Sequence, residues 1–133
     1  MAKTLRSTMS GIWLMQTVRL SIPVPSKVEY TVRHKGDGNN ELRVRFGNFW
    51  NLLWAKIHDF DLKHDHSESR SLDFTSDTTG SDDGMTDIRW RLSRAILTKA
   101  IDWELTYTIT RLKDGTDATD ACSPTITSEK DTD

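Results

Sequence analysis

Residues 28–46, VEYTVRHKGDGNNELRVRF, carry the clearest structural pattern in this chain of 133 residues. Apolar residues occupy every second position of 28–32 and again of 42–46, which is the period of a strand with one buried face. Between these segments, the glycines and asparagines of 35–40 tolerate the positive φ angles that a tight reversal needs. The stretch therefore predicts two strands joined as a β-hairpin.

Alternation also predicts strands at 12–22 and 103–109, whereas two other stretches show a helical period. Apolar residues at i, i+3, i+4 and i+8 predict a short helix over about 48–58. A second apolar stripe predicts a helix over 87–102. The first part of that stretch, 88–93, alternates well enough to form a strand, and the sequence leaves this alternative open.

These elements favour an α+β fold, in which an antiparallel β-meander of four or five strands carries two helices packed on one face. We expect a single domain over 1–115. The segment 116–133 is acidic and poor in large apolar residues, so it is expected to be a flexible tail. The stretch 75–87 holds Met85 as its one apolar residue and is expected to be a mobile surface loop.

Charge is distributed in blocks, although the net charge is only −2. The net charge is +6 over 1–58, −7 over 59–87, +4 over 88–113 and −5 over 114–133. Opposite blocks in one small domain commonly neutralise each other across the surface. The alternative interpretation is a basic binding face guarded by acidic loops.

Several classes of protein are disfavoured by what the sequence lacks. No apolar run approaches the roughly 20 residues that span a bilayer, and a single cysteine, Cys122, cannot form an intramolecular disulfide. We therefore expect a cytoplasmic, intracellular protein without a membrane partner. Cys122 lies in a polar context, and neither a Gly-x-Ser-x-Gly elbow nor a phosphate-cradling glycine loop is present. No catalytic residue and no cofactor is predicted, so an enzyme is not expected.

A weak metal-site hypothesis comes from the segment 58–66, which gathers three histidines and three aspartates. These are ligand types that divalent transition metals accept. The candidate ligands are His58, Asp61, His64 and His66. On one strand His58 would lie more than about 20 Å from His66, so a complete site would need a ligand from elsewhere. The alternative is a solvated polar strand end.

A nucleic-acid hypothesis comes from basic residues that lie among aromatic ones, because cations contact phosphates and aromatic rings stack on bases. The aromatic residues are Tyr30, Phe46, Trp50 and Trp90. The candidate nucleic-acid-binding residues are Arg33, Lys35, Arg43, Arg45, Arg89 and Arg91. The alternative is that the aromatic residues form the core and the arginines pair with the acidic loops.

The tripeptide Gly11-Ile12-Trp13 and the late Arg111 resemble the calycin pattern, in which an opening Gly-x-Trp is packed by a closing arginine. That resemblance implies an up-and-down barrel that holds a small apolar ligand. The two expected helices depart from this pattern.

The leading functional hypothesis is a non-enzymatic binding protein that acts through a protein–protein surface or through self-association, as a small viral or accessory protein does. It depends on the lack of a catalytic constellation and on the many aromatic residues, which interfaces favour. The expected partner is a protein or a second copy in a homo-oligomer. Single-stranded nucleic acid is the alternative partner, and a small apolar ligand in a calycin-like barrel is the further alternative.

Overall fold

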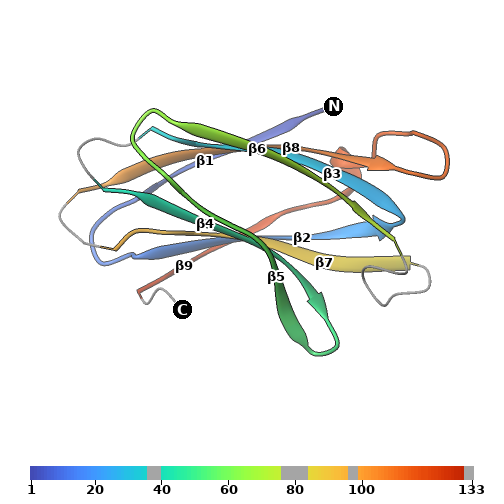
Figure 1. Ribbon diagram of the computed structural model, residues 1–133, viewed down its shortest axis with the longest axis horizontal. Coiled ribbons are helices and arrows are strands. Elements are labelled where there is room, and N and C mark those ends of the chain that lie inside the picture. The colour runs from blue at the N-terminus through green and yellow to red at the C-terminus, as the bar shows by residue number, and fades with distance from the viewer. Residues whose placement is uncertain (36–39, 76–83, 96–98, 131–133) are drawn as a thin grey trace.

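The computed structural model describes residues 1–35, 40–75, 84–95 and 99–130, and these residues form two antiparallel β-sheets packed face to face (Figure 1). The four-stranded sheet has the order β1-β8-β3-β6, and the five-stranded sheet has the order β5-β4-β7-β2-β9. The strands are β1 (Lys3–Met9), β2 (Met15–Val24), β3 (Ser26–His34), β4 (Leu42–Trp50), β5 (Leu53–Leu62), β6 (Ser67–Phe74), β7 (Gly84–Ser93), β8 (Ile101–Arg111) and β9 (Thr125–Glu129). The architecture is a β-sandwich.

The expected α+β fold with two helices on one face is wrong, because the described residues contain no α-helix. The single helical turn among them is the 3-10 element η1 (Thr119–Ala121). The stretch 48–58 is instead the end of β4, a two-residue turn and the start of β5. Asn51 and Leu52 have φ angles of 55° and 67°, the pair of positive values found in a type I′ hairpin turn. Apolar residues lie on both faces of this hairpin, which produced the helix-like spacing.

The second expected helix, over 87–102, is also wrong. Residues 87–93 belong to β7 and β8 begins at Ile101, while 96–98 lie outside the described residues. Ile88, Trp90 and Leu92 are fully buried and alternate with half-buried residues, so the strand alternation determines the structure here.

The alternating segments of 28–46 form the strands β3 and β4, but these strands are not paired as a hairpin. β3 pairs with β6 and β8 in one sheet, whereas β4 pairs with β5 and β7 in the other. Within the expected turn, 36–39 lie outside the described residues. Alternation shows that a strand has one buried face, but both sheets of a sandwich provide such a strand, so the pattern cannot assign the partner.

The C-terminal segment, for which composition predicts a flexible tail, contains the strand β9. β9 pairs in antiparallel register with β2, from Thr125 opposite Arg19 to Glu129 opposite Met15. Upstream of it, Ala118, Thr119 and Cys122 are buried, and the Thr119 hydroxyl accepts a hydrogen bond of 2.9 Å from the Ile109 amide. Residues up to Glu129 are therefore part of the sandwich. Of the expected mobile loop 75–87, positions 76–83 lie outside the described residues.

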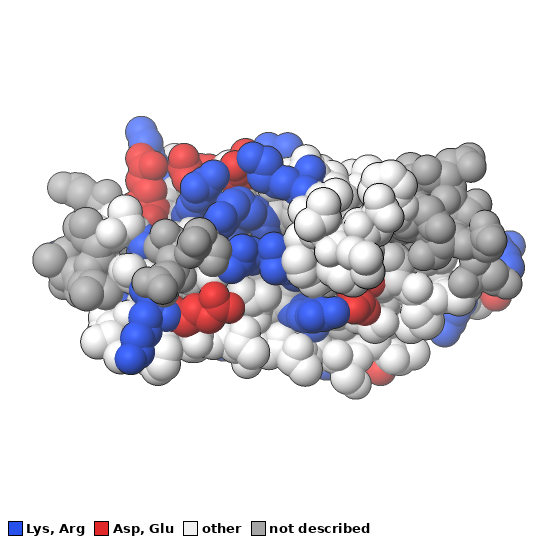
Figure 2. All heavy atoms as spheres, turned by 90° about the horizontal axis from the view of Figure 1, so that it is seen from below, with Lys and Arg blue, Asp and Glu red and all other residues white. Residues whose placement is uncertain are grey.

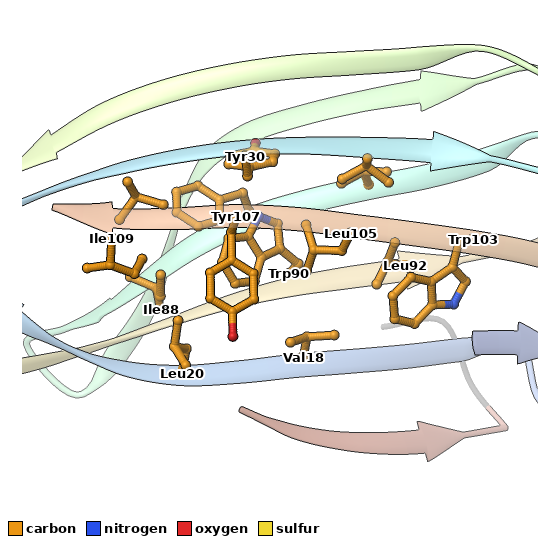
Figure 3. Close-up of a cluster of buried hydrophobic side chains, with 14 of the residues drawn as sticks. Val18, Leu20, Tyr30, Ile88, Trp90, Leu92, Trp103, Leu105, Tyr107 and Ile109 are labelled. Carbon is orange, nitrogen blue, oxygen red and sulfur yellow. The ribbon is translucent and has the colours of Figure 1, made fainter. Parts of the chain in front are cut away.

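The core lies between the two sheets and is rich in aromatic rings (Figure 3). Tyr30 and Tyr107 come from the four-stranded sheet, and their ring centroids lie 5.4 Å and 5.5 Å from that of Trp90 in the five-stranded sheet. Phe46 joins them at 5.0 Å from Tyr30. Such contacts bury large apolar areas and fix the separation of the layers. All four rings are consequently unavailable on the surface.

The structure does not have the architecture that the calycin resemblance implies. In the described segments no strand of one sheet pairs with a strand of the other, so the sheets do not close into one up-and-down barrel. Gly11 and Trp13 follow β1 at the end where Met9 lies opposite Ile101, whereas Arg111 ends β8 ten residues later, about 33 Å away along the strand. The described chain also contains no helix that is both long and apolar enough to cross a membrane.

Candidate functional site

The outer face of the five-stranded sheet gathers arginine side chains from three neighbouring strands. Arg19 on β2 lies opposite Arg89 on β7, and Arg91 on β7 lies opposite Arg45 on β4. Their sequence neighbours on these strands, such as Val18, Trp90 and Val44, are buried, so the two-residue period points the arginines outward. Figure 2, which views the molecule from below, shows Lys and Arg atoms grouped on this face.

Trp54, near the start of β5, lies among these cations. The guanidinium carbon of Arg89 lies 4.2 Å from the centre of the indole ring, and that of Arg19 lies 5.1 Å from it. The Phe49 ring on β4 packs against the same indole at 5.2 Å. These cation–π contacts hold the two guanidinium groups over the base of the β4–β5 hairpin.

Positive charge is in excess around Arg89. Burial is the largest cause, followed by the charges of Arg91 and Arg45, and together they lower the pKa of Arg89 to about 10. The attraction of Glu129 is weaker than either of these repulsions. The cluster of like charges therefore destabilises its own charged state, which is typical of a surface that binds an anion.

Carboxylates neutralise the margin of the cluster. Asp59 accepts two hydrogen bonds from Arg43, of 3.1 and 2.9 Å, and these hold the pKa of the Asp59 carboxyl at about 2. Asp87 pairs with Arg19 at 2.6 Å, and Glu129 approaches Arg91 at 3.7 Å. Carboxylates of the acidic block 59–87 and of the C-terminal segment thus place negative charge on this face. This is the neutralisation between opposite charge blocks that the sequence offers as one interpretation.

An open pocket of about 120 Å³ lies within the cluster. Gly47 lines it at a β-bulge, where the register shifts from Phe46 opposite His58 to Gly47 opposite Lys56. A Cβ atom on Gly47 would lie 2.8 Å from the carbonyl oxygen of Ala55, so only glycine permits this close approach of the strands. The pocket is lined by Arg45, Phe46, Gly47, Trp54, Ala55, Lys56, Arg89 and Arg91, which we call the cationic pocket.

The structure brings together four of the six residues considered for nucleic-acid binding and separates the other two. Arg43, Arg45, Arg89 and Arg91 lie on the outer face of the five-stranded sheet. The remaining two belong to or follow β3 in the other sheet, where Arg33 approaches Asp65 at 3.9 Å and Lys35 pairs with Glu104 at 2.8 Å.

Sequence reasoning missed Arg19, Trp54 and Lys56. The alternation at 12–22 could have placed Arg19 on an outward face, but nothing in the sequence pairs that strand with β7. Trp54 and Lys56 fall in the helix predicted over 48–58. A helix in that position gives no strand register, so the sequence does not predict that these residues lie beside the arginines.

The candidate metal ligands are dispersed. The His58 ring packs against Phe46 and shares a hydrogen bond of 2.7 Å with the Tyr30 hydroxyl, and burial lowers the pKa of His58. His64 and His66 follow β5, where His66 Nδ1 lies 3.0 Å from the carbonyl oxygen of His64. In the part of the chain that the structure describes, no group of three or more His, Cys, Asp or Glu side chains could hold a metal ion.

An apolar protrusion lies next to the cationic pocket. The tip of the β4–β5 hairpin, residues 49–54, extends beyond Asn48, the last residue of β4 that pairs with β7 (Figure 1). Asn48 is buried and donates a hydrogen bond of 2.8 Å to the Asp87 carbonyl, which anchors the hairpin at its base. Leu52 and Leu53 are 85% and 71% exposed, and Trp50 is 48% exposed. We call residues 49–54 the hairpin tip.

No family model and no curated protein matches the sequence. Among solved structures, the chain is similar to the Yersinia pseudotuberculosis-derived mitogen, with a TM-score of 0.49 and 12% identity over 80% of this chain and 83% of that one. It is also similar to a CBM4 structure, with a TM-score of 0.44 and 12% identity over 95% and 84% of the two chains. For a chain of Broad Bean Stain Virus the TM-score is 0.48, at 7% identity over 97% and 91%. No ligand or activity is transferred from these proteins.

Proposed function

We propose that this chain is a non-enzymatic binding protein, and that the cationic pocket on its five-stranded sheet binds an anionic ligand. The observation that carries the proposal is the convergence of Arg45, Arg89 and Arg91 on one open pocket beside an indole ring. Guanidinium groups donate paired hydrogen bonds to phosphate oxygens. A bound anion would also relieve the repulsion from Arg91 and Arg45, which adds to burial in lowering the pKa of Arg89.

Single-stranded nucleic acid is the ligand chemistry that we assign to this pocket. Its phosphates match the arginines, and its unpaired bases can stack on aromatic side chains at the pocket's rim. Phe49 packs on Trp54 on the pocket's side of the hairpin and is 37% exposed, so its ring has area available to a base. A protein partner or a homo-oligomer, the leading hypothesis from the sequence, remains a prediction that light scattering checks.

The test is fluorescence anisotropy with a labelled oligothymidylate at about 50 and 200 mM salt. We expect binding that weakens steeply with salt, because each neutralised phosphate releases counterions. Arg89→Ala with Arg91→Ala should weaken the affinity at least tenfold. The matched control is Arg6→Ala with Arg33→Ala on the four-stranded sheet, which removes the same charge from side chains that are 67% and 50% exposed. The proposal fails if both pairs weaken binding equally, or if the oligonucleotide does not bind at about 50 mM salt.

A further inference from the structure

The hairpin tip is apolar on both faces, which is unusual for a protruding element. The register pairs Phe49 with Trp54 on the side of the arginines and Trp50 with Leu53 on the opposite side. Leu52 occupies the turn with 85% of its surface exposed. Protruding turns in water are ordinarily polar, and contiguous exposed apolar surface marks a place where another apolar medium is contacted.

The cations of the neighbouring pocket begin at the base of this tip. Arg19 and Arg89 contact the Trp54 ring, and Lys56 lies two residues after Trp54 on β5. The tip therefore ends in leucine, carries tryptophan at its middle and base, and is bordered by arginine and lysine. The same sequence of chemistries occurs across a bilayer surface, from acyl chains through the carbonyl region to anionic headgroups.

Charge decides between the possible occupants of the tip. A second copy joined in a two-fold contact through the Phe49–Trp54 side of the tip would bring the arginine clusters of both molecules together, and like charges across an interface are unfavourable. A narrow hairpin also provides little of the roughly 800 Å² per partner of a standard protein interface. An anionic bilayer offers both an apolar medium for the tip and negative charge for the pocket.

We propose that the hairpin tip inserts into the surface of an anionic lipid bilayer while the cationic pocket contacts the headgroup phosphates. This inference rests on the proposed function, because the pocket is the part that attracts the anionic surface. The expectation of no membrane partner was derived from the lack of a spanning segment, and a protein that lies on a bilayer needs none.

The test is co-sedimentation of the full chain with vesicles of phosphatidylcholine alone or mixed with phosphatidylserine. We expect binding to the mixed vesicles and at least tenfold weaker binding to the neutral ones. Leu52→Asn with Leu53→Asn should weaken binding to the mixed vesicles at least tenfold. The variant loses the favourable transfer of two leucine side chains from water into the bilayer. Both side chains are largely exposed, so the folded state should be retained, as circular dichroism would verify. The matched control is Ile12→Asn, at a side chain that is 52% exposed on another part of the surface.

Each other outcome overturns the inference in a recognisable way. If the leucine variant binds mixed vesicles as well as the unaltered chain does, attraction is purely electrostatic and the tip does not insert. If the oligothymidylate binds but the vesicles do not, the proposed function stands and the membrane inference falls. If light scattering finds a dimer that the leucine variant dissociates, a second copy covers the tip. Failure to bind either ligand removes both proposals.

Discussion

The two outer faces of the sandwich are both polar, but they differ in how their polar groups are paired. On the four-stranded sheet, Thr4 and Thr106 share a hydrogen bond of 2.9 Å, and Thr31 and Ser69 share one of 2.6 Å. Glu104 lies between the cations of Arg6 and Lys35, at 3.6 and 2.8 Å. On the five-stranded sheet, arginines lie opposite arginines, and burial together with their repulsion lowers the pKa of Arg89.

The difference shows that the fold itself does not assign the function. Both sheets use the same two-residue period to hide apolar residues and expose polar ones. The chemistry of the exposed row distinguishes the two faces. The five-stranded face places arginine opposite arginine and has its carboxylates at the margin of the cluster. A cluster of like charges lowers stability, and such local violations of favourable pairing are expected at binding sites.

The largest expected effect comes from removing the strand that completes the charged face. Truncation after Gly115 deletes β9 together with the buried Ala118, Thr119 and Cys122. We expect the free energy of unfolding to fall by about 3 kcal/mol or more, which lowers the thermal midpoint by ~10 °C. Thermal denaturation followed by circular dichroism provides the measurement.

A shorter truncation after Pro124 is the control, because it removes β9 and retains the buried residues. It should lower the midpoint by less than half as much. A midpoint unchanged after the longer truncation would restore the flexible tail that composition indicates.

A smaller effect concerns the pH dependence of stability, to which a buried histidine of the four-stranded sheet contributes. His34 ends β3 in the four-stranded sheet, is fully buried, and has a lowered pKa because burial disfavours the imidazolium. The unfolded chain therefore binds a proton at higher pH than the folded one. Stability is fully present above the unfolded value of about 6.5 and is lost as pH falls below it towards the folded pKa.

We expect His34→Gln to flatten the dependence of unfolding free energy on pH between about 7 and 5, whatever it does to stability at neutral pH. Urea denaturation at several pH values measures this slope. His58 in the five-stranded sheet also has a pKa lowered by burial, so part of the slope should remain. An unaltered slope in His34→Gln would show that this ring is not the group that titrates.

The smallest expected effect is the change in stability when one charge is neutralised on either face. Glu104→Gln removes a carboxylate that Lys35 and Arg6 stabilise, and the pKa of Glu104 is lowered by its hydrogen bond with Lys35. We expect a loss of about 0.5 kcal/mol, because the pair is only partly shielded from solvent.

Arg89→Gln removes a cation from among cations, so its midpoint should be unchanged or higher even though its contact with Trp54 is lost. Differential scanning calorimetry at low salt can resolve the two midpoints. An Arg89→Gln midpoint lower than that of Glu104→Gln would mean that the arginine cluster stabilises the fold.

Local pattern in the sequence was sufficient for individual strands and insufficient for their assembly. The alternation at 28–32 and 42–46 correctly placed side chains inward and outward in β3 and β4. Pairing depends on contacts between residues distant in the sequence, so the assumed hairpin was wrong. The helix predicted over 48–58 was wrong because the hairpin tip is apolar on both faces. Its apolar residues therefore do not follow the two-residue period of a strand.

The same limit applies to the candidate site. Arg43 and Arg45 could be placed on one face by their spacing of two, but their meeting with Arg89 and Arg91 required the register of β4 with β7. Trp54 reaches Arg19 only because β4, β7 and β2 are neighbours in the sheet. Within 116–130, composition alone does not reveal that three small residues are buried and that 125–129 pair with β2.

The most direct measurement is an NMR titration of the isotopically labelled chain with oligothymidylate at low salt. Signals from the arginine Nε–H groups of Arg45, Arg89 and Arg91 and from the Trp54 indole N–H should shift together and saturate. Those of Arg6 and Arg33 on the four-stranded sheet should remain in place. Shifts confined to the four-stranded sheet, or spread evenly over both faces, would contradict the assignment of the cationic pocket as the binding site.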